Sequence, residues 1–154
     1  MYANLILGGF LVDNSFHYLL MVNQSLFQKK VFSKLSDTNL TIGQPKVLDY
    51  LAHHDGSIQK DIANGCQIDV ATLTGLLSRM EEKDLIVRKM KDGNRRSSYV
   101  YLTEKGRQSL QVIQEAFNTS EKEALEGINP QDVNTFMNVM LKICSNMTNK
   151  EELQ

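Results

Sequence analysis

A change of hydrophobic period near residue 85 constrains the fold of this chain more than any other feature. After it, residues 86–91 and 97–102 are rich in strand formers and flank Asp92-Gly93-Asn94, a sequence typical of a hairpin turn. Before it, apolar residues recur at the i, i+3, i+4, i+7 spacing of a helix with one apolar face, namely Leu73, Leu76, Leu77 and Met80. The sequence therefore predicts an amphipathic helix that is followed directly by a β-hairpin.

The segment before that helix predicts a second, shorter one. Ser57 is a good N-cap for a helix that carries Ile58 and Ile62 on one face, and Asn64-Gly65 predicts the turn that ends it. Asp69 is the expected N-cap of the helix with the apolar stripe. Two short helices joined by a turn form a helix-turn-helix, and a hairpin after the second helix is a wing.

Longer helices are predicted on both sides of this unit. Apolar residues recur at about helical spacing over 16–35, which predicts one long amphipathic helix, and the cap and turn formers of 36–39 end it. A further helix is expected to begin near Ile42 or Gly43 and to end before Gly56. After the wing, Thr103 is the expected cap of the next helix, and Asn129-Pro130 opens the last.

The last helix carries a nearly heptad apolar stripe, which a small winged domain does not need for its own core. We interpret this stripe as a seam between two copies of the chain. Its expected dimer-interface residues are Phe136, Met137, Met140, Cys144 and Met147.

Positive charge is concentrated around the predicted wing. The whole chain of 154 residues has a formal net charge of −1, so attraction to nucleic acid must come from local clustering. Residues 88–107 hold seven Lys and Arg against two acidic residues, a net charge of +5. This cluster indicates a surface that binds nucleic acid.

Winged-helix proteins place the second helix of the motif in the major groove, and wing arginines are attracted to the adjacent minor groove. Hydroxyl side chains on the helix reach base edges or phosphates, and an arginine reaches a phosphate or guanine. The expected DNA contacts are Thr72, Thr74, Ser78 and Arg79 on the helix and Arg95 and Arg96 on the wing. A solvated helix face and an ordinary solvated hairpin tip are the alternative interpretations. Gly75 permits close approach either of DNA or of a neighbouring helix.

The expected architecture is mostly α with a small β-hairpin wing. Residues 37–107 form a winged helix-turn-helix DNA-binding domain, and residues 1–36 and 108–154 form a helical dimerisation region. We expect no enzyme, because the sequence holds no nucleophile elbow, phosphate-cradling glycine loop or zincin helix. We expect no metal or other cofactor, since the side chains of the adjacent His53 and His54 diverge on a helix.

The cysteines and the N-terminal segment indicate a cytoplasmic protein. Cys66 and Cys144 lie 78 positions apart, which supports neither a disulfide framework nor a zinc site. Cys66 precedes the expected recognition helix, where oxidation would disturb DNA binding; a buried, inert thiol is the alternative. The apolar stretch 5–12 is interrupted by Gly8 and Gly9, so we expect neither a signal peptide nor a membrane anchor.

The order of these pieces resembles the MarR family of winged-helix transcription regulators. The resemblance covers residues 38–107, and its most diagnostic part is the pair of wing arginines followed by Leu-Thr-Glu-Lys-Gly. The matching residues are Leu40-Thr41, Gln44, Val47-Leu48, Ile62-Ala63, Asp69 to Thr74, Arg79-Met80-Glu81, Leu85 to Arg88, Asn94-Arg95-Arg96 and Leu102 to Gly106.

This resemblance implies a homodimer that binds a pseudo-palindromic operator of double-stranded DNA and represses a nearby gene. A small lipophilic or aromatic effector in the cleft between the dimer region and the winged domains would release it. Asn94 stands where the family commonly has an aspartate that pairs with a wing arginine, so that bond is weakened unless Asp92 substitutes. The segment 1–34 lacks the reactive cysteine of the family's peroxide sensors. The alternative function is a winged-helix protein–protein interaction module whose basic hairpin binds an acidic partner.

Overall fold

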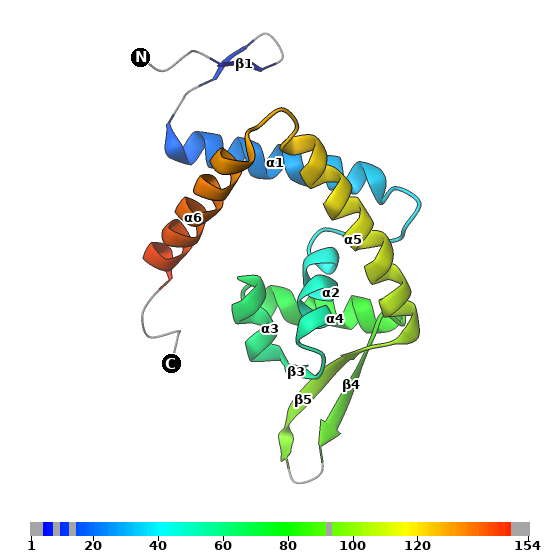
Figure 1. Cartoon of the computed structure of the whole chain (residues 1–154). Coiled ribbons are helices and arrows are strands. Elements are labelled where there is room, and N and C mark those ends of the chain that lie inside the picture. The colour runs from blue at the N-terminus through cyan, green and yellow to red at the C-terminus, as the bar shows by residue number, and fades with distance from the viewer. Residues whose placement is uncertain (1–4, 8–9, 13–14, 92–93, 149–154) are drawn as a thin grey trace. The chain divides into compact units, whose positions relative to one another are not determined.

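The computed structural model describes the backbone of residues 5–7, 10–12, 15–91 and 94–148 and the side chains of residues 15–90 and 98–148. Six helices and five strands follow one another in this part of the chain (Figure 1). The helices are α1 (Phe16–Lys34), α2 (Gln44–His53), α3 (Gln59–Cys66), α4 (Val70–Glu82), α5 (Glu104–Ala124) and α6 (Pro130–Met147). The strands are β1 (Leu5–Leu7), β2 (Phe10–Val12), β3 (Ser57–Ile58), β4 (Ile86–Lys91) and β5 (Asn94–Leu102).

The chain divides into two compact units, one up to Ser120 and one from Glu121 onward. The first unit contains α2, α3 and α4 and a three-stranded antiparallel sheet in the order β3-β5-β4. The hairpin β4–β5 extends from this group of helices (Figure 1). The predicted fold class, mostly α with a β-hairpin wing after a helix-turn-helix, is confirmed.

The apolar stripe of α4 lies at the centre of the core of the first unit. Its four residues are between 0% and 3% exposed. Burial of each such side chain stabilises the fold by about 1.5–3 kcal/mol. The neighbouring elements contribute the residues that complete this core, among them Leu48, Leu51, Ile62, Ile86, Val100 and Ile113.

The Leu-Thr-Glu-Lys-Gly block joins α5 to the turn between α4 and β4. The backbone N–H of Thr103 donates to the carbonyl of Leu85 at 3.2 Å, and the Thr103 hydroxyl donates to the carbonyl of Asp84 at 2.6 Å. The same hydroxyl accepts from the N–H of Gly106 at 3.0 Å, which confirms the predicted cap. A Cβ atom at Gly106 would lie 2.0 Å from the Leu85 carbonyl oxygen, so only glycine fits here without a backbone shift.

The start and end of α3 differ from the prediction. The sequence predicts that Ser57 caps this helix. Instead Ser57 lies in β3, where it pairs with Val100 of β5, and α3 begins at Gln59 without a side-chain cap. Asn64-Gly65 was expected to form a turn, but both residues are helical and the chain turns at Gln67, which has a φ of 51°. The reason is packing, because a Cβ at position 65 would lie 2.1 Å from Cε2 of Tyr50. Gly65 therefore allows α3 to approach α2 closely.

Two further differences concern the first 34 residues. The segments on either side of Gly8-Gly9, for which the sequence predicts no element, form an antiparallel pair of strands in which Leu5 lies opposite Val12. The helix predicted over 16–35 is present, but it is not amphipathic, since its apolar side chains are distributed around its axis. Those exposed are Phe16, Tyr18, Leu20, Met21 and Leu26. No helix in the described part of the chain is both long enough and apolar enough to span a membrane.

Two glycine-to-alanine variants test this description of the packing. Gly106→Ala places a methyl group against a backbone carbonyl, so we expect it to lower the free energy of unfolding by about 1–3 kcal/mol. Gly75→Ala is the matched control, because a Cβ in this α4 position meets nothing closer than Arg79 Nη1 at 3.5 Å. We expect it to raise the free energy of unfolding by about 0.5–1 kcal/mol, since alanine is the better helix former. Urea denaturation measures the free energy of unfolding of both variants. An unchanged midpoint for Gly106→Ala would contradict the close packing of Gly106 against the Leu85 carbonyl.

Candidate DNA-binding surface

The first turn of α4 is fixed by Asp69, as the sequence predicts. The carboxylate accepts from the backbone N–H of Thr72 at 2.8 Å and from the Thr72 hydroxyl. These hydrogen bonds, the one from the hydroxyl most of all, lower the pKa of Asp69. The carboxylate is therefore charged at neutral pH and stabilises the N-terminus of α4.

Gln59 connects the two helices of the helix-turn-helix. Its Nε2 donates to the Thr74 hydroxyl at 2.5 Å and to the carbonyl of Val70 at 3.3 Å. Gln59 is the first residue of α3, and its partners lie 15 and 11 positions further along the chain. The sequence alone does not indicate this role of Gln59, because no local spacing reveals a partner that only the turn between two helices brings near.

The structure places all four predicted contact residues of the recognition helix on α4. Thr72, Thr74 and Arg79 are exposed, and Ser78 is half-buried. The Thr74 hydroxyl donates to the carbonyl of Val70 at 2.7 Å, and the Ser78 hydroxyl donates to the carbonyl of Thr74 at 3.1 Å. These hydroxyl groups therefore donate their protons inside the protein. Only oxygen lone pairs remain as acceptors for a partner, and Thr74 already uses one of its two for Gln59.

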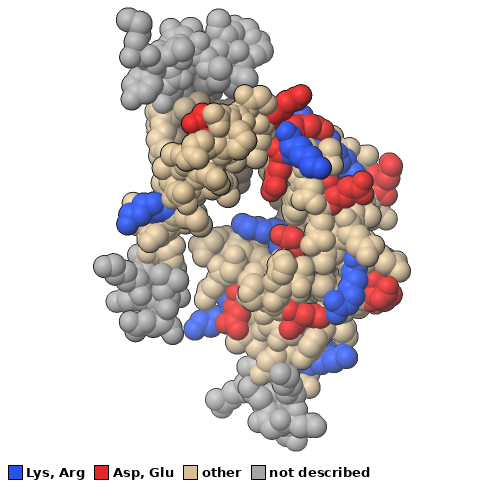
Figure 2. Space-filling view, viewed as in Figure 1, with Lys and Arg blue, Asp and Glu red and all other residues tan. Residues whose placement is uncertain are grey.

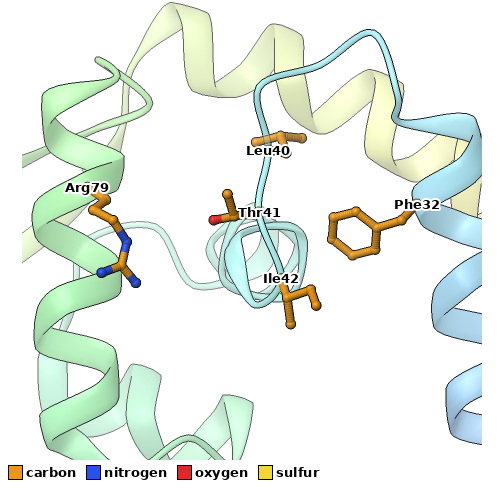
Figure 3. A pocket seen from close by; sticks show the side chains of 5 residues that line it. All are labelled: Phe32, Leu40, Thr41, Ile42 and Arg79. Atoms are coloured by element: carbon orange, nitrogen blue, oxygen red, sulfur yellow. The ribbon is translucent and has the colours of Figure 1, made fainter.

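Arg79 differs from the other three because its guanidinium has no hydrogen-bond or ion-pair partner among the described residues. It lines an open groove of about 550 Å³ together with Phe32 and residues 40–42. Figure 3 shows Arg79 on α4 and Phe32 on α1, with Leu40, Thr41 and Ile42 between them. The groove thus combines one cation with largely apolar walls.

The wing is attached to the recognition helix by an ion pair. Arg88 in β4 donates from Nε and Nη2 to one carboxylate oxygen of Glu81, at 2.8 and 2.5 Å, and its backbone N–H donates to the other at 3.2 Å. Arg88 thereby lowers the pKa of the Glu81 carboxyl. By sequence, Arg88 belongs to the basic cluster around the wing, but in the fold its charge holds β4 against α4.

Three other cations of the same cluster also have intramolecular partners. Lys105 donates to the carbonyl of Lys83 at 2.7 Å, and Arg107 forms an ion pair with Asp55 at 2.6 Å. Lys89 lies over the ring of Tyr101, 5.6 Å from its centroid. Basic and acidic side chains are interspersed on the described surface drawn in Figure 2. The local charge of +5 is therefore less available to a partner than the sequence indicates.

The wing tip carries the remaining predicted contacts. The backbone of Arg95 and Arg96 belongs to β5, but their side chains lie outside the described residues. Asp92, the alternative partner of a wing arginine, also lies outside the described residues. These contacts stay predictions.

The second unit contains α6, a helix of 18 residues with no buried residue. All five residues of the predicted seam are on it. Phe136, Met137 and Met147 are 54%, 53% and 72% exposed, Cys144 is exposed, and Met140 is half-buried. Apolar side chains exposed to this extent are typical of a surface that another protein chain covers.

The two cysteines have opposite environments. Cys66 is buried in α3, and burial raises the pKa of its thiol, so the thiol is protonated at neutral pH. Cys144 is exposed on α6. The described residues hold no group of three or more His, Cys, Asp or Glu that could bind a metal ion.

Comparison with known proteins gives a consistent result. The model of the MarR family matches residues 40–98. The HTH-type transcriptional regulator SarZ of Staphylococcus aureus (strain MRSA252) is 31% identical over 120 residues, which cover 73% of this chain and 80% of SarZ.

Solved structures share the fold. The S. aureus MepR–DNA complex aligns with a TM-score of 0.79 and 27% identity, over 88% of this chain and 100% of MepR. CouR from Rhodococcus jostii RHA1, solved with p-coumaroyl-CoA bound, aligns with a TM-score of 0.76 and 22% identity, over 89% of this chain and 96% of CouR.

A recognition helix that is capped, exposed on its outer face and followed by a wing defines a winged helix-turn-helix protein of the DNA-binding class. The chain belongs to the MarR family and is a DNA-binding transcriptional regulator. Proteins of this family are regulators of transcription and not enzymes.

The ion pair between α4 and β4 gives stability that depends on pH. Because the pKa of Glu81 is lowered from 4.5 in the folded chain, its contribution is present above the unfolded pKa and is lost as pH falls through the folded value. We expect Glu81→Gln to lower the free energy of unfolding at pH 7 by about 0.5–1 kcal/mol, the range of partly exposed ion pairs. The difference from the wild type should shrink as the pH is lowered below about 4.5.

Glu82→Gln is the matched control for this measurement, since Glu82 is its exposed neighbour on α4. Urea denaturation between pH 7 and pH 3 should show no comparable loss for Glu82→Gln. Equal stability of the two variants at pH 7 would refute the role assigned to Glu81.

Proposed function

We propose that the chain acts as a homodimer that binds a pseudo-palindromic operator and represses the adjacent gene. The observation that carries this proposal is the exposed outer face of α4, on which Asp69 binds Thr72 and Gln59 binds Thr74. In this family fold, such a face is the one that enters the major groove. The proposed contacts are Thr72, Thr74, Ser78 and Arg79 in the major groove and Arg95 and Arg96 in the adjacent minor groove.

The proposal also assigns a role to each part of the chain. Residues 37–107 form the DNA-binding domain, and residues 1–36 and 108–154 form the dimerisation region. The exposed apolar residues of α1 and α6 support the second assignment. Because its DNA target lies there, we place the protein in the cytoplasm.

Release by a small lipophilic or aromatic effector completes the proposal. It is supported by the p-coumaroyl-CoA in the structure of CouR, whose fold the chain shares. The effector would favour a spacing of the two recognition helices that no longer matches half-sites about 34 Å apart. An effector that binds the dimer and leaves its operator affinity unchanged would contradict this mechanism.

DNA binding is tested by fluorescence anisotropy on duplexes tiled from the DNA upstream of the chain's own gene, beside a scrambled duplex. We expect tight binding to one near-palindromic tile, with log K falling against log salt by about 0.9 for each phosphate neutralised. Arg79→Ala should weaken binding to that tile about tenfold or more, because it removes the free cation of α4.

Lys122→Ala is the control for Arg79→Ala, since it removes an exposed cation near the end of α5. It should leave the affinity for the operator unchanged. Weak binding that is equal on every tile would contradict operator recognition and favour a protein–protein interaction module.

Dimer formation is tested by sedimentation equilibrium. We expect the wild type to have about twice the mass of the 17.5 kDa chain. Phe136→Glu places a charge in the proposed seam and should give the mass of one chain. Asn138→Glu, at an exposed α6 position outside the seam, should remain a dimer. A Phe136→Glu variant that remains a dimer would show that Phe136 does not lie in the interface.

A further inference from the structure

The hydroxyl groups on α4 have no proton left to donate to a base. The protons of Thr72, Thr74 and Ser78 are all donated inside the first unit, to Asp69, to the carbonyl of Val70 and to the carbonyl of Thr74. The Thr74 oxygen also accepts from Gln59. The Thr74 hydroxyl therefore keeps one lone pair and no proton for a partner. Thr74 is exposed, so its methyl group becomes a main group that it can offer to a partner.

Apolar groups occupy the exposed first turn of the same helix. Val70, the first residue of α4, is 53% exposed, and Ala71 beside it is exposed. Val70 and Thr74 are four residues apart, so they are neighbours on the helix surface. We call these three residues, Val70, Ala71 and Thr74, the methyl patch.

The methyl patch lies where a winged-helix protein meets base edges, at the N-terminal part of its recognition helix. It is therefore continuous with the DNA-binding surface. The C5-methyl group of thymine is the apolar group that a base pair presents in the major groove, and alanine, threonine and similar side chains recognise it by contact. The outer face of α4 also permits close approach, since Gly75 has no side chain and is only half-buried.

We propose that the methyl patch reads thymine, so that each operator half-site carries thymines whose C5-methyl groups contact Val70 and Ala71. This inference rests on the proposed docking of α4 in the major groove. It deepens that function, because it names the base that the helix selects and the residues that select it. Gln59 acts as a positioning residue, because its hydrogen bonds hold Thr74 and the carbonyl of Val70.

The test removes single methyl groups from the DNA. In the tile that binds, each thymine is replaced in turn by uracil, which keeps the base pairing and lacks the C5-methyl group. We expect the wild-type chain to bind about fourfold more weakly for each methyl group that it contacts, the effect of one buried methyl-sized group. Thymines outside the half-sites should be insensitive.

Protein variants then assign the effect to the patch. Val70→Ala should bind the thymine operator more weakly and should no longer distinguish thymine from uracil at the position that Val70 contacts. Val112→Ala is the matched control, since Val112 is an exposed valine of α5, and it should retain full discrimination. Circular dichroism and urea denaturation check that both variants fold like the wild type.

The outcomes separate this inference from the proposed function. If no tile binds specifically, operator recognition itself fails, and the inference fails with it. If an operator binds but no uracil substitution weakens it, the function stands and thymine reading is overturned. If uracil weakens binding equally for the wild type and Val70→Ala at every position, another part of the chain reads the methyl groups and the assignment to Val70 is overturned.

Discussion

Burial of one face of α4 is the interaction on which the rest of the structure depends. Its four apolar residues contact the core that α2, α3, the sheet and the first part of α5 complete. Because a helix with one face fully buried has a fixed rotation about its axis, the residues on its opposite side are also fixed. The core thus determines which side chains α4 presents on its exposed face, although none of the core residues lies on that face.

Several cations and hydroxyl groups around this core bind other groups of their own chain, although the sequence alone indicates that they are available to a partner. Arg88, Lys105 and Arg107 bind carboxylate or carbonyl groups of their own chain. The hydroxyls of α4 donate to backbone or side-chain acceptors close by. The hydroxyl side chains of α4 are therefore held in place before any partner arrives, so less of their conformational entropy remains to be lost on binding.

The sequence predicts those elements whose signals are local. The apolar stripe of α4, the Asp69 and Thr103 caps, the proline start of α6 and the β4–β5 hairpin all depend on residues within a few positions of one another. The failures involve partners far along the chain. Ser57 became part of a strand because β5 lies beside it, and Gly65 stayed helical because Tyr50 packs against it. Gln59 and Glu81 gained their roles in the candidate site for the same reason, since only the folded chain brings Thr74 and Arg88 to them.

The intramolecular use of cations has a consequence for the attachment of the protein to DNA of any sequence. Non-specific attachment to DNA depends on the number of phosphates that free lysines and arginines neutralise. Arg88 and Arg107, at the base of the wing, are each paired with a carboxylate of their own chain, so each must give up an ion pair before it neutralises a phosphate. Fewer cations of this part of the chain are therefore free for attachment to DNA of any sequence than the local charge of +5 indicates.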